Sequence, residues 1–446
     1  MNPVNNLIFV SVGGTGLKVL ESLIHLASSG NGPKQIIPII IDQDSENGNK
    51  KRAVNVIKTY MKMRRKIKEI DKGNIFFDPN IELDDVNNLE PYFFIPEDIR
   101  NNFQSAVNYM RMNDIEKKML DSLFTSEQMT GKLDHGFKKR AFLGSILMNK
   151  MLINQSKLDY TAGLNKIVDQ FKKLPKDQLH VVICGSIFGG TGASGIVKIG
   201  GFFKKNLPDH HVKAIMLLPY FKVSTDWEDG DADKGLINSN NDMISSKIVL
   251  SMYKDEIRKN FDSVYFLGTT LPNDKVSDIA YTGGDKQENK EHIFELLSAI
   301  GAAEYKNSNN FEVNNYNFES NAQQIPQRFE FSMKNILNKE YGNNNSLKLL
   351  ELANLIVNSE KYGDDWINRQ PWFISKNEED LNLIKNWAAS YSEFWKQLSH
   401  KDWQQFYLDS SETNDDFGLS AKLSINLPKN VKNSKNIAHL FMSLQK

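Results

Sequence analysis

Two glycine-rich segments carry the residues of this chain that are best suited to bind a phosphate. The first, residues 13–16 (GGTG), follows the apolar run 7–12, and the second, residues 185–195 (GSIFGGTGASG), follows the apolar run 180–184. Glycine lets the backbone approach a ligand closely, and free N–H groups at the start of a helix attract an anion. Each segment therefore predicts a phosphate-binding turn between a buried strand and a helix. A tight turn without a ligand is the alternative.

The candidate phosphate-binding residues are the glycines and the hydroxyl side chains of these turns. They are Gly13, Gly14, Thr15 and Gly16 in the first turn and Gly189, Gly190, Thr191, Gly192, Ser194 and Gly195 in the second. The run 36–41 then ends at Asp42, and an acid at the end of such a strand commonly binds ribose hydroxyls. Strand, glycine turn, helix, strand and acid together predict the nucleotide-binding half of an α/β sheet. A P-loop is excluded, because its motif does not occur.

Two glycine turns about 175 residues apart that meet one nucleotide resemble the tubulin and FtsZ superfamily. The signature loop of that superfamily reads Gly-Gly-Gly-Thr-Gly-[Ser/Thr]-Gly, and residues 188–195 read FGGTGASG. The chain departs by Phe188 in place of the first glycine and by the insertion of Ala193. The resemblance implies a Rossmann-like, tubulin/FtsZ-type nucleotide-binding domain that holds GTP with Mg²⁺. Among its members, the chain looks most similar to a divergent prokaryotic tubulin-like family.

The resemblance extends to further elements and assigns further binding residues. A strand at 214–219, a helix at 245–258, a strand at 263–268 and a helix at 293–300 follow in the expected order. Asn289 would read the guanine edge, with an ordinary helix N-cap as the alternative, and His292 would pack or stack on the base. The segment 136–144 occupies the place of the γ-phosphate loop. Lys139 and Arg140 would neutralise phosphate charge there, unless they form a solvated basic helix start.

Catalysis is expected to need a second subunit. In tubulin-type polymers, an acidic loop after the long central helix of the next protomer positions water on the γ-phosphate. The corresponding region here is 304–312, which makes Glu304 and Glu312 the candidate catalytic acids. Nucleotide binding is therefore expected, whereas its hydrolysis stays open.

Composition limits the class of protein. The 446 residues are 40% hydrophobic and 25% charged, which is typical of a soluble globular protein. The formal net charge of zero argues against nucleic acid as the main partner. A single cysteine, Cys184, indicates a reducing compartment and excludes a cysteine-based metal site. Apolar runs stay below the ~18 residues of a membrane span, and no signal segment opens the chain. A cytoplasmic protein is expected.

Two regions are predicted. Residues 1–306 would form the nucleotide-binding domain, with a large insertion at about 45–134 that contains a basic helix at 50–68. Residues 307–446 would form a mostly helical, tryptophan-rich domain that offers a surface for self-association or for another protein. Five of the six tryptophans lie there: Trp366, Trp372, Trp387, Trp395 and Trp403. The helix 381–398 carries Leu383, Trp387, Tyr391 and Trp395 at helical spacing, which favours a core stripe, and residues 417–425 alternate as a late strand does.

Three functions remain. The favoured one is a GTP-binding, tubulin-like protein that forms nucleotide-dependent homo-oligomers or filaments, in which hydrolysis is completed across the subunit interface. The alternative is a nucleotide-gated sensor or scaffold that never polymerises, for example in a bacterial defence system. A Rossmann-type oxidoreductase is the third, although no tyrosine–lysine or histidine–acid catalytic pair stands out and the signature loop would be unexplained.

Overall fold

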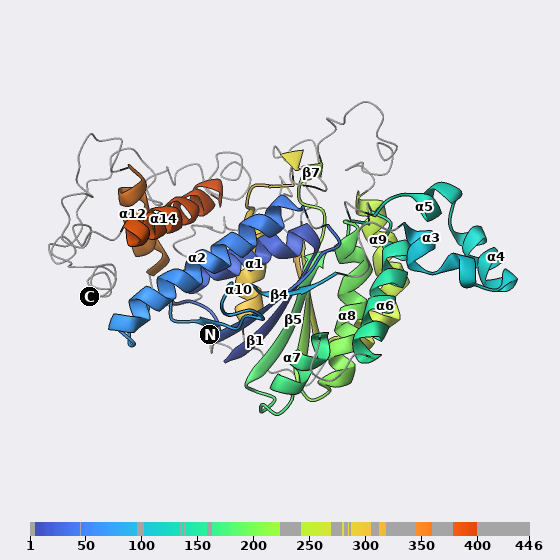
Figure 1. The fold of residues 1–446 in the computed structure, drawn as a ribbon, viewed down its shortest axis with the longest axis horizontal. Helices are drawn as coiled ribbons and strands as arrows, with labels where there is room; N and C mark the ends of the chain where they lie inside the picture. The colour runs from blue at the N-terminus through green and yellow to red at the C-terminus, as the bar shows by residue number, and fades with distance from the viewer. Residues whose placement is uncertain are drawn as a thin grey trace, which may run out of the picture.

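The chain folds as a parallel β-sheet with helices on both faces and a pair of helices at one end of the long axis (Figure 1). The predicted α/β class is thereby confirmed. The computed structural model describes residues 5–44, 46–95, 102–133, 136–137, 139–157, 163–223, 242–268, 279–280, 284, 287–304, 312–317, 345–358 and 378–398.

The sheet has eight strands, and all of their pairings are parallel. Its order is β10-β8-β6-β5-β1-β2-β3, and β4 also pairs with β2. The strands are β1 (Asn6–Val12), β2 (Gln35–Ile41), β3 (Asn80–Ile81), β4 (Tyr92–Phe94), β5 (Leu179–Ser186), β6 (His211–Leu217), β8 (Ser263–Gly268) and β10 (Glu312–Asn317). A separate pair joins β7 (Lys222–Val223) to β9 (Ile279–Ala280). Because both faces of the sheet are covered, its central strands are almost continuously apolar.

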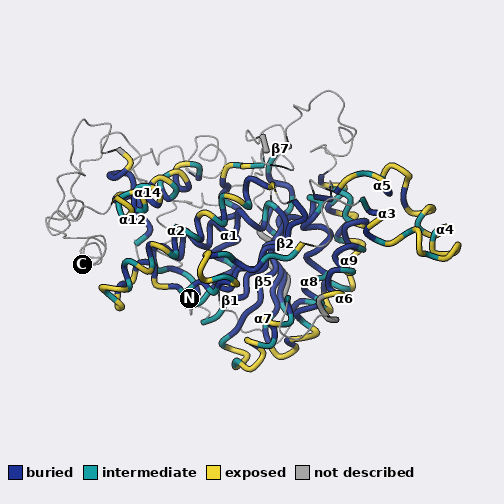
Figure 2. Tube along the Cα trace, viewed as in Figure 1, coloured by how far each residue is buried: buried dark blue, intermediate teal, exposed yellow. Residues whose placement is uncertain are grey.

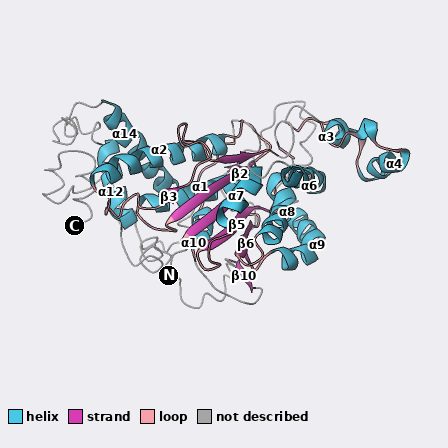
Figure 3. Ribbon diagram, turned by 60° about the horizontal axis from the view of Figure 1, so that its bottom comes forward, coloured by secondary structure: helices cyan, strands magenta, loops and turns pink. Residues whose placement is uncertain are grey.

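Helices cover both faces of the sheet (Figure 3), and a hydrophobic core lies on each face. Leu7 and Phe9 point into one core and Ile8 and Val10 into the other, as the alternation of a strand requires. The first face is covered by α1 (Gly13–Ser28), α2 (Gly48–Ile70) and α10 (Ile293–Ala303), and the second by α6 (Ala141–Lys157), α7 (Gly163–Phe171), α8 (Thr191–Asn206) and α9 (Asp242–Asn260).

The region predicted as an insertion contributes to the sheet and also forms a projecting arm. Its first helix, α2, packs along α1, and its strands β3 and β4 extend the sheet beyond β2. The arm consists of α3 (Phe103–Ala106), the 3-10 turn η1 (Tyr109–Arg111), α4 (Asp114–Leu123) and α5 (Ser126–Thr130). It extends past α6 and α9 at one end of the molecule (Figure 1).

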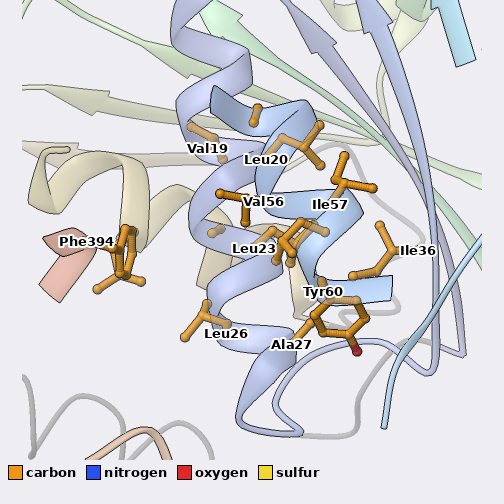
Figure 4. Close-up of a cluster of buried hydrophobic side chains, with 14 of the residues drawn as sticks. Val19, Leu20, Leu23, Leu26, Ala27, Ile36, Val56, Ile57, Tyr60 and Phe394 are labelled. Atoms are coloured by element: carbon orange, nitrogen blue, oxygen red, sulfur yellow. The ribbon is translucent and has the colours of Figure 1, made fainter. Parts of the chain in front are cut away.

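The basic helix predicted at 50–68 is α2, and one of its faces belongs to the core. Val56, Ile57 and Tyr60 interleave with α1 (Figure 4), and the Tyr60 hydroxyl donates a 2.6 Å hydrogen bond to the carbonyl oxygen of Pro79. Farther along this helix, Ile67 is also buried, whereas Val54 and Met61 are half-buried.

The helices α12 (Asn345–Asn358) and α14 (Glu378–Leu398) pack onto the α1–α2 layer. The His25 ring of α1 stacks on Phe394 with centroids 4.4 Å apart, and Trp387, Tyr391 and Trp395 are buried as predicted. The strand expected at 417–425 lies outside the described residues. In the part of the chain that the structure describes, every helix is too short or too polar to cross a membrane.

Both glycine turns are the first turns of helices, which differs from the prediction. Helices were expected after Gly16 and at Ile196, but α1 begins at Gly13 and α8 at Thr191. The glycines are needed there for close packing. A Cβ on Gly16 would lie 2.5 Å from the carbonyl oxygen of Cys184, and Gly13 adopts a φ of +74° that disfavours other residues.

The close contact at Gly16 predicts a position-specific cost in stability. We expect Gly16→Ala to lower the free energy of unfolding by about 1–3 kcal/mol, because the added methyl group meets rigid backbone. Gly301→Ala in α10 is the matched control. A Cβ there has open space and improves helix propensity, so this variant should be neutral or up to about 1 kcal/mol more stable. Urea unfolding of both variants checks this, and equal effects would contradict the packing argument.

Candidate nucleotide-binding site

The two glycine turns meet at the point where the winding of the sheet reverses. Strands β1 and β5 are neighbours, but the chain leaves β1 toward β2 on one side and leaves β5 toward β6 on the other. The N-termini of α1 and α8 therefore lie side by side at the carboxyl ends of the strands. A Cβ on Gly13 would lie 3.1 Å from the Cβ of Thr191 and 3.4 Å from the Gly192 nitrogen. Ligands of doubly wound sheets bind at such a switch point.

Three further segments surround the turns. A Cβ on Gly136 would lie 3.5 Å from Thr191 Oγ1, so the segment predicted as a γ-phosphate loop does reach the second turn. On the other side, a Cβ on Gly14 would lie 2.9 Å from Gln287 Nε2 and 3.3 Å from Asn47 Nδ2. The first turn, the second turn, the start of α2 and the segment before α10 thus lie together at the carboxyl ends of β1 and β5.

A hydrogen-bonded set of polar side chains lies beside the first turn. The Asn47 amide donates to Asp42 Oδ2 and to Gln287 Oε1, both at 2.9 Å. Asp42 Oδ1 also accepts from the backbone N–H of Asp44 at 3.2 Å. The backbone nitrogen of Asn49 donates to the carbonyl oxygen of Gln287 at 2.7 Å. These bonds fasten the segment before α10 to the start of α2.

The Asp42 carboxyl titrates near neutral pH. Burial and, secondarily, the neighbouring Asp44 carboxylate raise its pKa from 3.8 to about 7, although the hydrogen bonds from Asp44 N–H and Asn47 oppose the shift. At neutral pH, the Asp42 carboxyl is therefore protonated in part of the molecules, and in that form it can donate a hydrogen bond as well as accept one.

Asn289 lies in this polar wall but does not cap a helix. Its backbone nitrogen donates to Asn49 Oδ1 at 2.9 Å, and its carbonyl oxygen accepts from Arg52 Nη1 at 2.8 Å. The N-cap of α10 is His292, which forms a capping box with Glu295. The alternative role considered for Asn289 is therefore wrong, because the helix begins four residues later. His292 is buried and stacks on Phe294, in agreement with the packing role expected for it.

The two basic residues of the third segment have different surroundings. Lys139 adopts a left-handed backbone with a φ of +61°, and its ammonium group forms an ion pair with the buried carboxylate of Asp242 at the start of α9. The Arg140 guanidinium lies beside Gly131, where a Cβ would be 3.4 Å from Nη1. Their roles toward phosphate stay predictions.

Ser194 and Gly195 face the protein. The buried Ser194 hydroxyl lies 2.6 Å from the carbonyl oxygen of Gly190 and 3.1 Å from that of Ala141, so its single proton is used within the fold. A Cβ on Gly195 would lie 2.9 Å from a Val12 methyl group. In this structure both residues hold α8 against α6 and β1.

A buried polar chain connects the first turn to α10. Thr15 lies close enough to Tyr220 to oppose the effect of burial, which raises the pKa of the Tyr220 hydroxyl, and this hydroxyl donates to Glu295. Lys18 Nζ forms a 2.6 Å ion pair with Glu295 Oε1. Burial raises the pKa of Glu295, while Lys18 and the hydrogen bonds oppose the shift.

The same network continues through α2 to α14. Arg52 Nε lies 2.7 Å from Glu21 Oε2, and Arg52 also pairs with Glu291. Burial alone would raise the pKa of Glu21, but Arg52 and His25 outweigh it and lower that pKa to about 2. Burial and the neighbouring carboxylates raise the pKa of Glu291. The Glu291 N–H donates to Gln397 Oε1 at 2.9 Å, which reaches the C-terminal helical region.

The candidate catalytic acids lie at the amino ends of the strands, whereas the glycine turns lie at the carboxyl ends. The carbonyl oxygen of Glu304 accepts from Lys213 Nζ at 3.0 Å, near the amino end of β6. Glu312 begins β10 opposite Ser263, the first residue of β8. Parallel strands of this length rise roughly 20 Å, so neither acid reaches the glycine turns of its own chain.

Sequence reasoning missed Asn47, Gln287 and Tyr220. Asn47 precedes a basic helical run and so carries an N-cap signal, which its 3.4 Å bond from the Lys50 N–H confirms. Nothing in the sequence links Gln287 to Gly14 or Tyr220 to Thr15, because these contacts join segments that are far apart along the chain.

The parallel sheet and the two glycine turns define a doubly wound, Rossmann-like α/β protein. No protein-family model matches the chain, and no curated protein does. Among solved structures, the chain is similar to the C-terminal tail truncated TubZ protein of Clostridium botulinum phage c-st, at 13% identity and a TM-score of 0.22. The match covers 59% of this chain and 52% of TubZ, about half the length of that neighbour. A likeness this weak carries no argument about function.

The raised pKa of Asp42 predicts a change of stability with pH. Between the unfolded pKa of 3.8 and the folded value of about 7, the folded chain binds the extra proton, so this contribution to stability is lost as the pH rises. Asp42→Asn removes the titration. Relative to wild type, its free energy of unfolding should rise on the order of 4 kcal/mol from pH 4 to pH 8. Urea unfolding across this range measures it, with exposed Asp209→Asn as the control, and parallel profiles would refute the assignment.

Proposed function

We propose that this protein binds GTP and forms nucleotide-dependent homo-oligomers or filaments in the manner of tubulin-like proteins. The observation that carries the proposal is the meeting of two glycine-rich helix starts at the switch point of a parallel sheet. The first N–H groups of a helix have no partner within it, and two such sets aimed at one crevice suit a chain of phosphates.

The surrounding residues suit the other parts of a nucleotide. Thr191 and the N–H groups of 13–16 and 189–192 would bind phosphates, and Lys139 and Arg140 would add positive charge. Asp42 would bind the ribose, and Asn289 the base, with Gln287 between them and the first turn. Among the described residues, no group of three or more His, Cys, Asp or Glu side chains is arranged for a metal. Mg²⁺ needs few protein ligands beside phosphate oxygens, so its binding with GTP remains compatible with this site.

Hydrolysis would require two subunits. The glycine turns lie at the carboxyl ends of the strands, and the acids Glu304 and Glu312 lie at the amino ends. A head-to-tail contact along the strand direction would therefore bring the acids of one subunit to the nucleotide of the next. Such a heterologous contact extends into a filament when its rotation does not close a ring.

GTP turnover per molecule, measured over a wide range of protein concentration with ATP in parallel, tests the proposal. We expect turnover near zero at low concentration and a rise above a threshold, because the site is complete only between subunits. Low turnover that does not depend on concentration, or tight binding without turnover, would overturn the filament mechanism.

Removal of one hydroxyl group tests phosphate binding itself. Thr191→Val keeps the shape of the side chain but removes a donor to a charged group, so the dissociation constant for GTP should rise about 10-fold or more. Thr130→Val, on the exposed helix α5, is the matched control and should bind as wild type does. Titration calorimetry compares them, and equal affinities would remove Thr191 from the site.

A mixing experiment tests catalysis across the interface. The double variant Glu304→Gln/Glu312→Gln should bind GTP normally but lose turnover, because its acids serve the neighbouring subunit. Mixing it with Thr191→Val, at GTP concentrations too low for the latter to bind, should restore up to about a quarter of wild-type turnover through mixed contacts. Weakened GTP binding by the double variant, or no restoration, would contradict action in trans.

The buried polar chain favours a second candidate, a nucleotide-gated sensor. A ligand that moves Thr15 would act on Tyr220 and Glu295, and the network through Arg52 and Glu291 leads on to α14. A change of tryptophan fluorescence on GTP binding, without polymerisation at any concentration, would favour this function over the filament.

A further inference from the structure

Exposed apolar side chains gather on two helices at the end of the molecule that carries the arm. Of the fifteen large hydrophobic residues that are exposed in the described chain, eight lie on or beside α4 and on α9. They are Met110, Ile115, Met119 and Leu123 in the arm and Met243, Ile244, Ile248 and Met252 on α9. Scattered exposed hydrophobic residues are ordinary, but contiguous rows mark interaction sites.

Helix α4 presents its apolar side to solvent. Ile115, Met119 and Leu123 are four residues apart and form one stripe, with Ile115 81% and Met119 62% exposed. None of the ten residues of α4 is buried, and Figure 2 shows the helix as an exposed projection. Local signals hold it, since Asn113 and Glu116 form a capping box. The stripe therefore contributes little to the fold of its own chain.

Helix α9 carries a stripe of the same spacing. Its inner side, with Val249, Tyr253 and Ile257, is buried against α8. Its outer side presents Ile244 and Ile248, which are 58% and 62% exposed, followed by Met252. Each stripe spans nine residues, or about 12 Å of helix, so the two can lie along one another.

The charges beside the two stripes are opposite in sign. Acidic side chains are exposed around the α4 stripe, and basic side chains around the α9 stripe. The acidic set is Asp114, Glu116 and Asp121, and the basic set is Lys247, Lys254, Arg258 and Lys259. Two lysines on α4, and Asp255 and Glu256 on α9, reduce this contrast without reversing it. Complementary charge fixes the register and the choice of partner at an interface.

We propose that these helices join two copies of this chain into a two-fold dimer, in which α4 of each copy packs on α9 of the other. A two-fold interface pairs patch i of one copy with patch j of the other, and the reverse. Both helices lie at the same end of the molecule (Figures 1 and 2), which allows the two contacts to form together. The match of spacing and charge within one chain points to a second copy rather than to an unrelated protein.

The dimer goes beyond the proposed function and does not depend on it. Neither stripe includes a residue of the glycine turns or the acids Glu304 and Glu312, so the dimer is expected without nucleotide. Failure of the proposed function would appear as missing GTP binding or turnover. Failure of this inference would appear as a monomer in nucleotide-free buffer.

Cross-linking between copies gives a positive test of the contact. The one native cysteine, Cys184, is buried, and burial raises the pKa of its thiol. New cysteines would therefore react selectively. Full-length Met119→Cys and Ile248→Cys chains with tags of different size are mixed without nucleotide and treated with a short bis-maleimide. We expect a 119–248 heterodimer product well above that of Ile70→Cys mixed with Ile248→Cys, since Ile70 is exposed on α2. Equal yields would overturn the proposal.

Sedimentation equilibrium tests the apolar stripe in the same buffer. The wild-type chain should be a dimer at micromolar concentration. The double variant Ile115→Lys/Met119→Lys should raise the dissociation constant at least about 100-fold, because two charges would enter an apolar contact. Val86→Lys, at an exposed position outside both helices, should leave it unchanged. A wild-type monomer, or a dimer that the double variant does not weaken, would refute the interface, and binding of the stripe to another protein alone would do the same.

Discussion

The close approach of β1 and β5, together with the helices that follow them, constrains the rest of this molecule. The β1–α1 segment and the β5–α8 segment contact each other backbone to backbone. A Cβ on Gly16 or on Gly185 would lie 2.5 Å from a carbonyl oxygen of the opposite strand, and Gly192 packs on the backbone of Ser186. Only glycine allows this distance. The chain then winds away from the pair in both directions, which places the two glycine turns side by side at the switch point of the sheet.

That contact brings together the amino-terminal ends of two helices, which carry partial charges of the same sign. The partial positive charges at the starts of α1 and α8 repel one another, and their first N–H groups lack partners within the helices. An anion placed between the two helix starts would be attracted by both. Farther along α1, three buried carboxylates form ion pairs with two basic side chains. Lys18 pairs with Glu295, and Arg52 pairs with both Glu21 and Glu291. Removal of one partner would leave an uncompensated buried charge. These ion pairs therefore hold α2 and α10 against α1, and the hydrogen bond from Glu291 to Gln397 adds α14.

The sequence allowed the strands to be predicted far better than the contacts between them. The strand at 263–268 agrees to the residue with β8, and the runs 7–12 and 36–41 are each one residue short, because apolar runs between turn signals are local features. The helix starts were wrong, since glycine is permissive and only tertiary packing decides whether it is helical. The same holds for the site. Asp42 and the turns were recognisable by type and order, whereas the bond of Asn47 to Gln287 joins residues 240 positions apart and has no local signature.

The geometry of the two proposed contacts also constrains any assembly. A head-to-tail contact uses the carboxyl and amino edges of the sheet, along the strand direction, and the reciprocal α4–α9 contact uses one end of the molecule, where the arm projects past α6 and α9 (Figure 1). The α4–α9 surface includes neither the glycine turns nor the candidate acids, which belong to the head-to-tail contact. If both contacts formed, the repeating head-to-tail contact would build filaments and the two-fold contact would join the filaments in pairs. With the proposed two-fold contact alone, the assembly would close at two copies. The nucleotide dependence of the head-to-tail contact therefore decides between filament and sensor, and the dimer is common to both.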